Sequence, residues 1–221
     1  MPTNTAAPYR FPGVLIKTVT SLDVLSGGRI NFGIGAGSPF TRHNVEEFEA
    51  GGLGIPFGSL ATRFEQLEEV LQVAHQMWRG DETPFDGKQY QLKRPLNSPN
   101  TLQSPHPPIL IGGSGERRTL PLVARYADAC NLFDIPGSGF ADDLRHKLDV
   151  LRRLCDEIGR DFDTIEKTTA TAIDPDDLDG LRRHLDKLRD VGIDQPILSA
   201  DRPWDEATLG TLAGVLPALS A

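Results

Sequence analysis

The sequence has little that would suit a secreted or membrane-spanning protein. Only two cysteines, Cys130 and Cys155, occur among its 221 residues. They are too few and too far apart for a disulfide framework or a Cys-x-x-Cys metal site, and no other metal-ligand set is evident. No apolar run approaches the length of a membrane span, and residues 1–10 lack the apolar core of a signal peptide. We therefore expect a cytoplasmic protein with reduced cysteines.

The chain also lacks a surplus of basic residues. It carries 23 Lys and Arg against 31 Asp and Glu, which gives a net charge of -8 and a pI near 5.1. Proteins that bind nucleic acid or anionic membranes through their charge need a basic face, so we expect neither partner. The 38% of hydrophobic residues is ordinary for a globular domain with a sizeable core.

Helical and strand-like patterns alternate along the chain. Apolar residues that recur with a period near 3.6 predict helices, and short β-branched or glycine-bounded apolar runs predict strands. Residues 84–92 favour a hairpin that turns at Asp86-Gly87. The helices are expected at residues 12–25, 60–79, 119–126, 140–158, from 174 onwards and 204–219, and the strands at residues 29–35, 109–111, 129–133, 165–173 and 196–199.

Five strands, each followed by a helix, and one leading helix predict a parallel sheet covered by helices. A complete (β/α)₈ TIM barrel has eight such units in about 250 residues, so this α/β pattern fits an incomplete barrel of about the last five units. An open five-stranded, doubly wound sheet fits the pattern as well. Either way, two strand edges are left exposed, and such edges favour pairing with another chain.

The run from Pro105 to Leu120 reads as a buried strand, a glycine-rich turn and a helix. Backbone N–H groups at a helix start bind anions, so Gly112, Gly113, Ser114 and Gly115 form a candidate phosphate site. The alternative is a sharp corner with glycines for packing. The turn is not a dinucleotide fingerprint, because Arg118 stands where the third glycine should be, and the segment Gly33–Ser38 has the same defect at Ser38.

Several motifs together resemble the luciferase-like family of flavin- and deazaflavin-dependent oxidoreductases. Within this family, the pattern from Pro107 to Thr119 is most similar to the branch that uses coenzyme F420, a deazaflavin. The resemblance spans nearly the whole chain. It rests on Tyr9-Arg10-Phe11-Pro12, Lys17, Leu22–Arg29, Gly33–Gly37, Arg63–Glu69, Phe85–Tyr90, Pro105–Asn131 and Gly159-Arg160-Asp161.

The resemblance implies a TIM-barrel oxidoreductase, with residues 1–221 forming a single luciferase-like domain. The cofactor ring would lie at the carboxyl end of the strands, with its phosphate-bearing tail at the glycine-rich turn. Coenzyme F420 would exchange a hydride with a small organic substrate. The alternatives are an FMN-dependent monooxygenase and a truncated barrel that is inactive alone and serves in binding or assembly. In the last case, a homodimer could complete the sheet.

Three features depart from the family pattern. Roughly three strand-helix units usually precede the position of Tyr9, and residues 1–8 cannot replace them. Ser38 stands where a tryptophan is usual, and Pro121 where an arginine is common. Because the missing units supply part of the ring pocket and of the substrate wall, they bear most directly on activity.

The resemblance and the barrel rule also give the remaining candidate residues. Gly35, Gly37 and Ser38 would let the backbone approach the cofactor ring, or would simply pack a strand on a helix. His43, in the loop that follows, could polarise a substrate or donate a proton, with Glu46 or Glu47 as its partner. A solvated loop explains these three residues equally simply. Arg117 and Arg118 would pair with a phosphate or an acidic tail, or lie exposed in a first helical turn.

Overall fold

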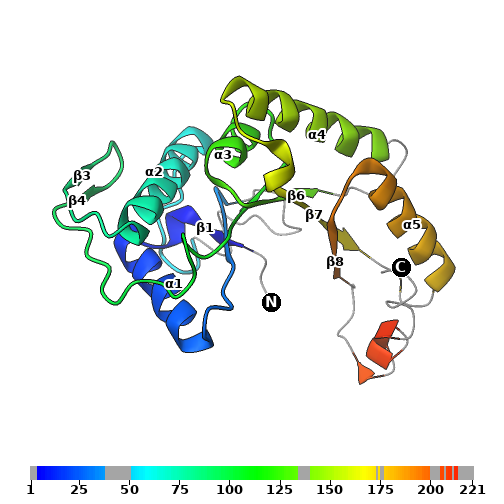
Figure 1. The fold of residues 1–221 in the computed structure, drawn as a ribbon, viewed down its shortest axis with the longest axis horizontal. Coiled ribbons are helices and arrows are strands. Elements are labelled where there is room, and N and C mark those ends of the chain that lie inside the picture. Colours follow the sequence, from blue (N-terminus) through cyan, green and yellow to red (C-terminus); the bar gives the residue numbers. More distant parts are fainter. Residues whose placement is uncertain are drawn as a thin grey trace. The chain divides into compact units, whose positions relative to one another are not determined.

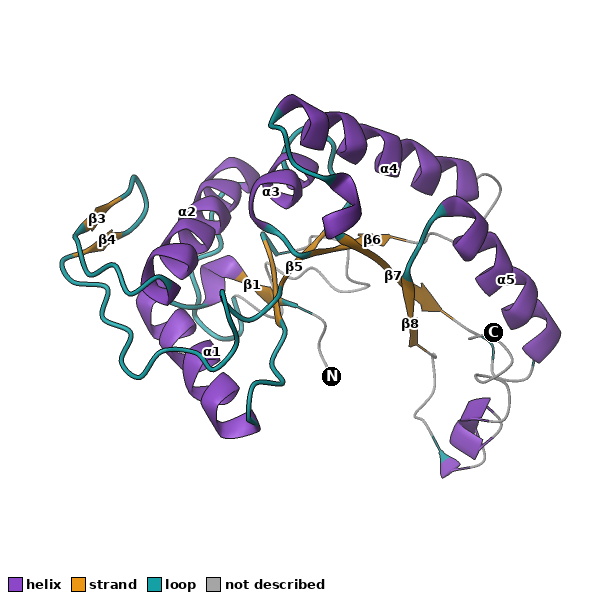
Figure 2. Ribbon diagram, in the orientation of Figure 1, coloured by secondary structure: helices purple, strands orange, loops and turns teal. Residues whose placement is uncertain are grey.

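The computed structural model describes residues 4–37, 51–133, 140–172, 174, 177–199, 205–206, 208–210 and 212–213. Its contacts divide the chain into two compact units. The first comprises Met1–Gly112 with Tyr126–Asp128, and the second comprises Gly113–Arg125 with Ala129–Ala221. Helices and strands alternate through both units (Figures 1 and 2).

The first unit contains three parallel strands in the order β1, β2, β5. Ile34 in β2 lies opposite Thr5 in β1 and Ile111 in β5. β1 precedes the leading helix, where the sequence analysis expected no strand, because two residues are too few to show any periodicity. The hairpin predicted at residues 84–92 is confirmed as β3 and β4, but its turn spans residues 87–90 and not Asp86-Gly87, because Asp86 pairs with Gln91 in the ladder. The elements are β1 (Thr5–Ala6), α1 (Pro12–Ser26), β2 (Phe32–Gly35), α2 (Leu60–Trp78), β3 (Phe85–Asp86), β4 (Gln91–Leu92) and β5 (Ile109–Gly112), with a 3₁₀ turn at Ala7–Tyr9.

Helices α1 and α2 lie side by side over this unit (Figure 1). Pro12 occupies the first turn of α1, where its missing N–H costs nothing, and Gly27 ends the helix in the left-handed conformation. The apolar stripe of α2 is buried and includes Leu67, Leu71 and Trp78. The Trp78 indole N–H donates to the hydroxyl of Thr20 at 3.1 Å, which ties the two helices together inside the core.

The second unit contains the parallel strands β6, β7 and β8 in that order. Asn131 in β6 lies opposite Thr168 in β7, which lies opposite Gln195 in β8. Helices α4 and α5 pack against each other (Figure 2). The elements are α3 (Thr119–Tyr126), β6 (Ala129–Phe133), α4 (Phe140–Glu157), β7 (Glu166–Ala172), α5 (Leu178–Val191) and β8 (Gln195–Ser199), with a 3₁₀ turn at Phe162–Thr164.

The structure can be compared with the predicted start of α5 and with the predicted C-terminal helix. The predicted start of α5 at residue 174 is wrong, because Asp177 caps the helix by accepting the Gly180 N–H at 2.8 Å. A later aspartate therefore displaces the helix start by a few residues. The described residues 206, 208–210 and 212–213 are helical, within the helix predicted at 204–219. The rest of that prediction lies outside the described residues.

Cys130 and Cys155 are buried and unpaired with each other, as expected. Burial raises the pKa of the Cys130 thiol to about 12, so this group is not an activated nucleophile. Among the described residues, no helix combines the length and the apolar character that crossing a membrane requires.

A buried carboxylate holds the loop before β5 against α1. Asp23 is fully buried, and it accepts the backbone N–H of Leu102 at 2.7 Å and the side-chain amide of Gln103 at 2.7 Å. Burial alone would raise the pKa of Asp23. The hydrogen bonds from Gln103 and from the Leu102 backbone outweigh it, so the pKa lies below its ordinary value of 3.8.

We expect Asp23→Asn to lower the free energy of unfolding by about 1.5–3 kcal/mol at pH 7, since a charged acceptor of several hydrogen bonds is lost. The wild-type pKa is lower in the folded state, so this stabilisation is present above pH 3.8 and is lost as the pH falls through the folded-state value. Urea unfolding at pH 7 and at lower pH should show the two proteins converging in acid. The exposed Asp86→Asn is the matched control, and equal stabilities of Asp23→Asn and wild type at pH 7 would contradict the assignment.

Candidate cofactor site

The predicted phosphate turn follows β5 and leads into α3. Gly113 has a φ of +127°, which favours glycine, and a Cβ atom there would come within 3.2 Å of the Thr119 side chain. The Gly113 N–H donates to the Asn131 carbonyl oxygen in β6 at 2.9 Å. This amide is therefore used to hold the turn in place and is not available to an anion.

The backbone N–H groups of the next four residues have no hydrogen-bond acceptor among the described residues. Within the described part of the chain, no acceptor lies within hydrogen-bond reach of the N–H groups of residues 114–117. The first helical hydrogen bonds come after them, since the Gly115 carbonyl accepts from Thr119 at 2.8 Å and from Leu120 at 3.0 Å. Unpaired N–H groups before a helix carry partial positive charge. The turn can therefore bind an anion through its backbone.

Ser114 adds a hydroxyl to these donors. Its Oγ accepts the Phe133 backbone N–H at 2.9 Å, which leaves the hydroxyl hydrogen able to donate elsewhere. Phe133, at the end of β6, is itself partly exposed. The sequence had no signal for this contact, because the two residues are distant along the chain.

The acidic residue of the turn is neutralised by α4. Glu116 accepts from the Lys147 ammonium at 2.5 Å and lies 3.2 Å from the His146 Nε2 atom. The hydrogen bond from Lys147 is the main cause of a lowered pKa of Glu116. Arg117 and Arg118 are exposed beside it. Because Lys147 compensates the negative charge of Glu116, that charge would repel an anion at the turn less strongly.

Thr119 is a residue that the sequence analysis missed. It is buried at the start of α3, and its side chain fills the space beside both Gly113 and Gly115. A Cβ atom at Gly115 would come within 3.1 Å of the Thr119 Oγ1 atom. The two glycines and the threonine therefore form one packed corner. In the sequence, Thr119 reads only as the first residue of a helix.

Two buried polar side chains, in β6 and β7, hold the part of β6 to which the turn is hydrogen-bonded. The Asn131 side-chain amide donates to the Thr168 hydroxyl at 2.9 Å, and that hydroxyl donates to the Cys130 carbonyl at 2.9 Å. Both side chains are nearly inaccessible to solvent. Because a buried polar group without a partner is costly, this arrangement fixes the position of Asn131, whose carbonyl receives the Gly113 N–H.

The glycines at the ends of β2 and β5 serve close packing within the first unit. A Cβ atom at Gly35 would contact the Gly112 carbonyl at 3.5 Å, and one at Gly112 would overlap the side-chain amide of Asn4. Without a side chain, Gly35 lets the Gly112 carbonyl approach closely, and Gly112 leaves room for the Asn4 side chain. This packing accounts for the two glycines without a ligand, which leaves a role for Gly35 at a cofactor ring as a prediction.

Arg63 fixes the carboxyl end of β2. It is buried, and its guanidinium donates to the carbonyls of Gly37 at 2.7 Å and Ala36 at 3.2 Å. The same group donates to the Gly58 carbonyl and lies 4.1 Å from the centre of the Phe57 ring. Gly37 itself has a φ of +82°. Four candidates lie outside the described residues and follow Gly37 in the sequence. They are Ser38, His43, Glu46 and Glu47.

Comparison with known proteins identifies the fold. A family model described as luciferase-like monooxygenase matches residues 3–190. The F420-dependent glucose-6-phosphate dehydrogenase of Gordonia bronchialis is 28% identical over 169 residues, which are 75% of this chain and 46% of that protein. The chain spans about half the length of the curated relatives it matches.

Two solved structures extend this comparison. An F420-dependent secondary alcohol dehydrogenase in complex with an F420-acetone adduct has a TM-score of 0.82 at 16% identity, covering 98% of this chain and 78% of that one. A monooxygenase from Streptomyces bottropensis has a TM-score of 0.74 at 16% identity, covering 98% and 77%. The chain therefore has the α/β fold of the luciferase-like TIM barrels, with parallel strands in each of its two units.

We expect Arg63→Lys to lower the free energy of unfolding by about 2–3 kcal/mol, because one ammonium cannot reach the carbonyls of Gly37, Ala36 and Gly58 together. Urea denaturation measures this loss. Arg79→Lys, an exposed arginine at the end of α2, should change stability by only a few tenths of a kcal/mol. Equal stability of the two variants would argue that the guanidinium does not organise this region.

Proposed function

The chain belongs to the luciferase-like monooxygenase family, and we propose that it is an oxidoreductase that binds coenzyme F420 and exchanges a hydride between it and a small organic molecule. The support for a phosphate-bearing cofactor is the set of unpaired N–H groups at residues 114–117, with the Ser114 hydroxyl beside them. The F420-dependent dehydrogenase among the relatives supports the deazaflavin over other phosphate-bearing ligands.

The residues at the turn fit the phosphate group of such a cofactor. Gly113 and Gly115 let the backbone of the turn pack closely on the Thr119 side chain, and Gly112 leads the chain into the turn. Backbone amides and Ser114 would hold the phosphate oxygens, while Arg117 and Arg118 would attract the rest of an anionic tail. Bound coenzyme F420 supplies a hydride donor or acceptor at its deazaflavin ring.

The ring end of the site is assigned to the carboxyl end of β2. We propose that Gly35, Gly37 and Ser38 border the ring, because Arg63 holds the backbone at Gly37 in a defined position. His43, with Glu46 or Glu47, is proposed to hold or move a proton on the substrate, from the loop that follows this strand. The substrate class beyond a small organic molecule stays open.

The second candidate is an FMN-dependent monooxygenase, which the description of the family model favours. FMN also carries a phosphate, so the same turn would bind it. The third candidate is an incomplete barrel that acts in binding or assembly without a cofactor, since the strand order of the described residues ends at β1 and β8 and leaves two edges.

Cofactor titrations separate these candidates. We expect the purified chain to bind coenzyme F420 more tightly than FMN, and to bind the deazaflavin that lacks its phosphate-bearing tail at least ten-fold more weakly, followed by fluorescence of the ligand. Tighter binding of FMN than of F420, with riboflavin weaker than FMN, would favour the monooxygenase. Binding of neither cofactor would leave the assembly role.

Substitutions at the turn test the phosphate assignment directly. Arg117 is exposed, so Arg117→Ala should weaken F420 binding by about two- to five-fold, the range of a solvent-screened ion pair, without changing stability. Ser114→Ala should weaken binding further, because a direct donor is lost. Arg153→Ala, an exposed arginine on α4, is the matched control. Unchanged affinity in both turn variants would refute binding at this turn.

A further inference from the structure

An acidic residue stands within the glycine-rich turn itself. Glu116 is one of the residues 114–117, whose backbone N–H groups have no acceptor among the described residues. Unpaired N–H groups at a helix start attract a carboxylate for the same reason that they attract a phosphate. A freely moving Glu116 side chain would therefore compete with a phosphate for these groups and repel it. The turn suits an anionic ligand only while this carboxylate is held elsewhere.

Helix α4 holds the Glu116 carboxylate. The Lys147 ammonium donates to the Glu116 Oε1 atom at 2.5 Å, and the His146 Nε2 atom lies 3.2 Å from the same oxygen. The Lys147 side chain is 18% exposed, and its other carboxylate neighbour, Asp143, lies 3.8 Å away. Because a largely buried ammonium is screened less by water and salt than an exposed one, Lys147 holds the Glu116 side chain firmly against α4.

The same ion pair sets the charge that a ligand meets at the turn. With Glu116 compensated by Lys147, the exposed residues Arg117 and Arg118 give the turn a net positive charge. Loss of the Lys147 charge alone would leave the Glu116 charge beside the ligand and weaken the binding of an anion. Loss of the Glu116 charge alone would leave Lys147 less compensated and strengthen it. An ion pair that merely ties the turn to α4 would instead weaken binding whichever partner is removed.

We propose that Lys147 is a positioning residue for the phosphate group of the cofactor. It keeps the Glu116 carboxylate on α4, and so leaves the N–H groups of residues 114–117 open to the phosphate. This role rests on the proposed function, because it requires that the phosphate binds at the turn. Lys147 acts through Glu116, and His146 adds a second contact to the same carboxylate oxygen.

A double-substitution cycle tests this role through the direction of each effect, with F420 affinity measured by ligand fluorescence. Lys147→Met should weaken binding about three- to five-fold, and Glu116→Gln should tighten it about two-fold, as expected for partly screened charges. The variant with both substitutions should return to about wild-type affinity, because the two residues act as a coupled pair. Lys147→Arg should keep the wild-type affinity, since a guanidinium also pairs with a carboxylate.

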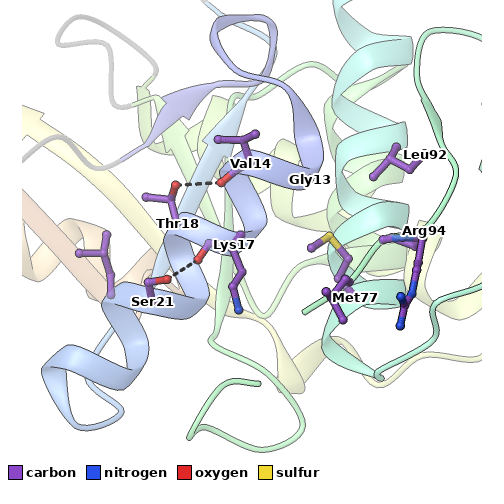
Figure 3. A pocket seen from close by; sticks show the side chains of 11 residues that line it. Gly13, Val14, Lys17, Thr18, Ser21, Met77, Leu92 and Arg94 are labelled. Carbon is purple, nitrogen blue, oxygen red and sulfur yellow. Dashed lines mark hydrogen bonds between the residues drawn. The ribbon is translucent and has the colours of Figure 1, made fainter. Parts of the chain in front are cut away.

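Arg94 and Glu82 provide the matched control, because they form an exposed ion pair in the first unit. Arg94 lines the groove beside α1 that Figure 3 shows, whereas the turn belongs to the second unit. Arg94→Met and Glu82→Gln make the same changes of charge and should leave F420 affinity unchanged. The deazaflavin that lacks the phosphate-bearing tail should bind equally to all these variants. Circular dichroism verifies folding, and Lys147→Gln replaces Lys147→Met if the latter fails this check.

Three results would overturn the role of Lys147: unchanged affinity in Lys147→Met, weaker binding by Glu116→Gln, or no recovery when Glu116→Gln is added to Lys147→Met. A wild type that binds F420 no better than the deazaflavin without its tail would instead refute phosphate binding at the turn, and this role with it. The two failures are distinguishable, because the first appears in the variants and the second in the wild type alone.

Discussion

The candidate site depends on one backbone contact, the hydrogen bond from the Gly113 N–H to the Asn131 carbonyl. Gly113 has a left-handed φ of +127° just after β5, and the N–H groups of residues 114–117 that follow have no acceptor among the described residues. Thr119 fills the space under the turn, and Asn131 is itself fixed by Thr168. The anion-binding capacity at residues 114–117 is thus a consequence of how this corner is packed.

The first unit uses buried charged side chains for the same purpose. Asp23 holds the segment around Leu102, Arg63 holds the end of β2, and Glu69 accepts the backbone N–H groups of Lys88 and Tyr90 at 2.8 Å in the hairpin. In each case, one charged side chain satisfies several backbone groups of a loop or a turn. Such loops can border a ligand because their shape is fixed without it.

Much of the fold could be predicted from periodicity and glycine placement. The pattern gave α2, α3 and β6 nearly residue for residue, since each has a clear apolar repeat and a defined end. It missed β1, which is too short to have a pattern, and it placed the start of α5 at residue 174, before the observed cap at Asp177. The glycine-rich strand-to-helix corner after β5 was recognised, because it is a local motif, whereas the role of its glycines and arginines in binding a phosphate stays a prediction.

What the sequence by itself determined is therefore local: which segments form helices and strands, where the glycine-rich turn lies, and the family resemblance that these motifs carry. Only the tertiary structure decided which amides of that turn remain unpaired, and that Thr119, Arg63 and Asn131 position the surrounding backbone. The physical reason is that hydrogen-bond satisfaction is a property of groups brought together by folding. No spacing along the chain reveals that the Asn131 carbonyl accepts the N–H of Gly113.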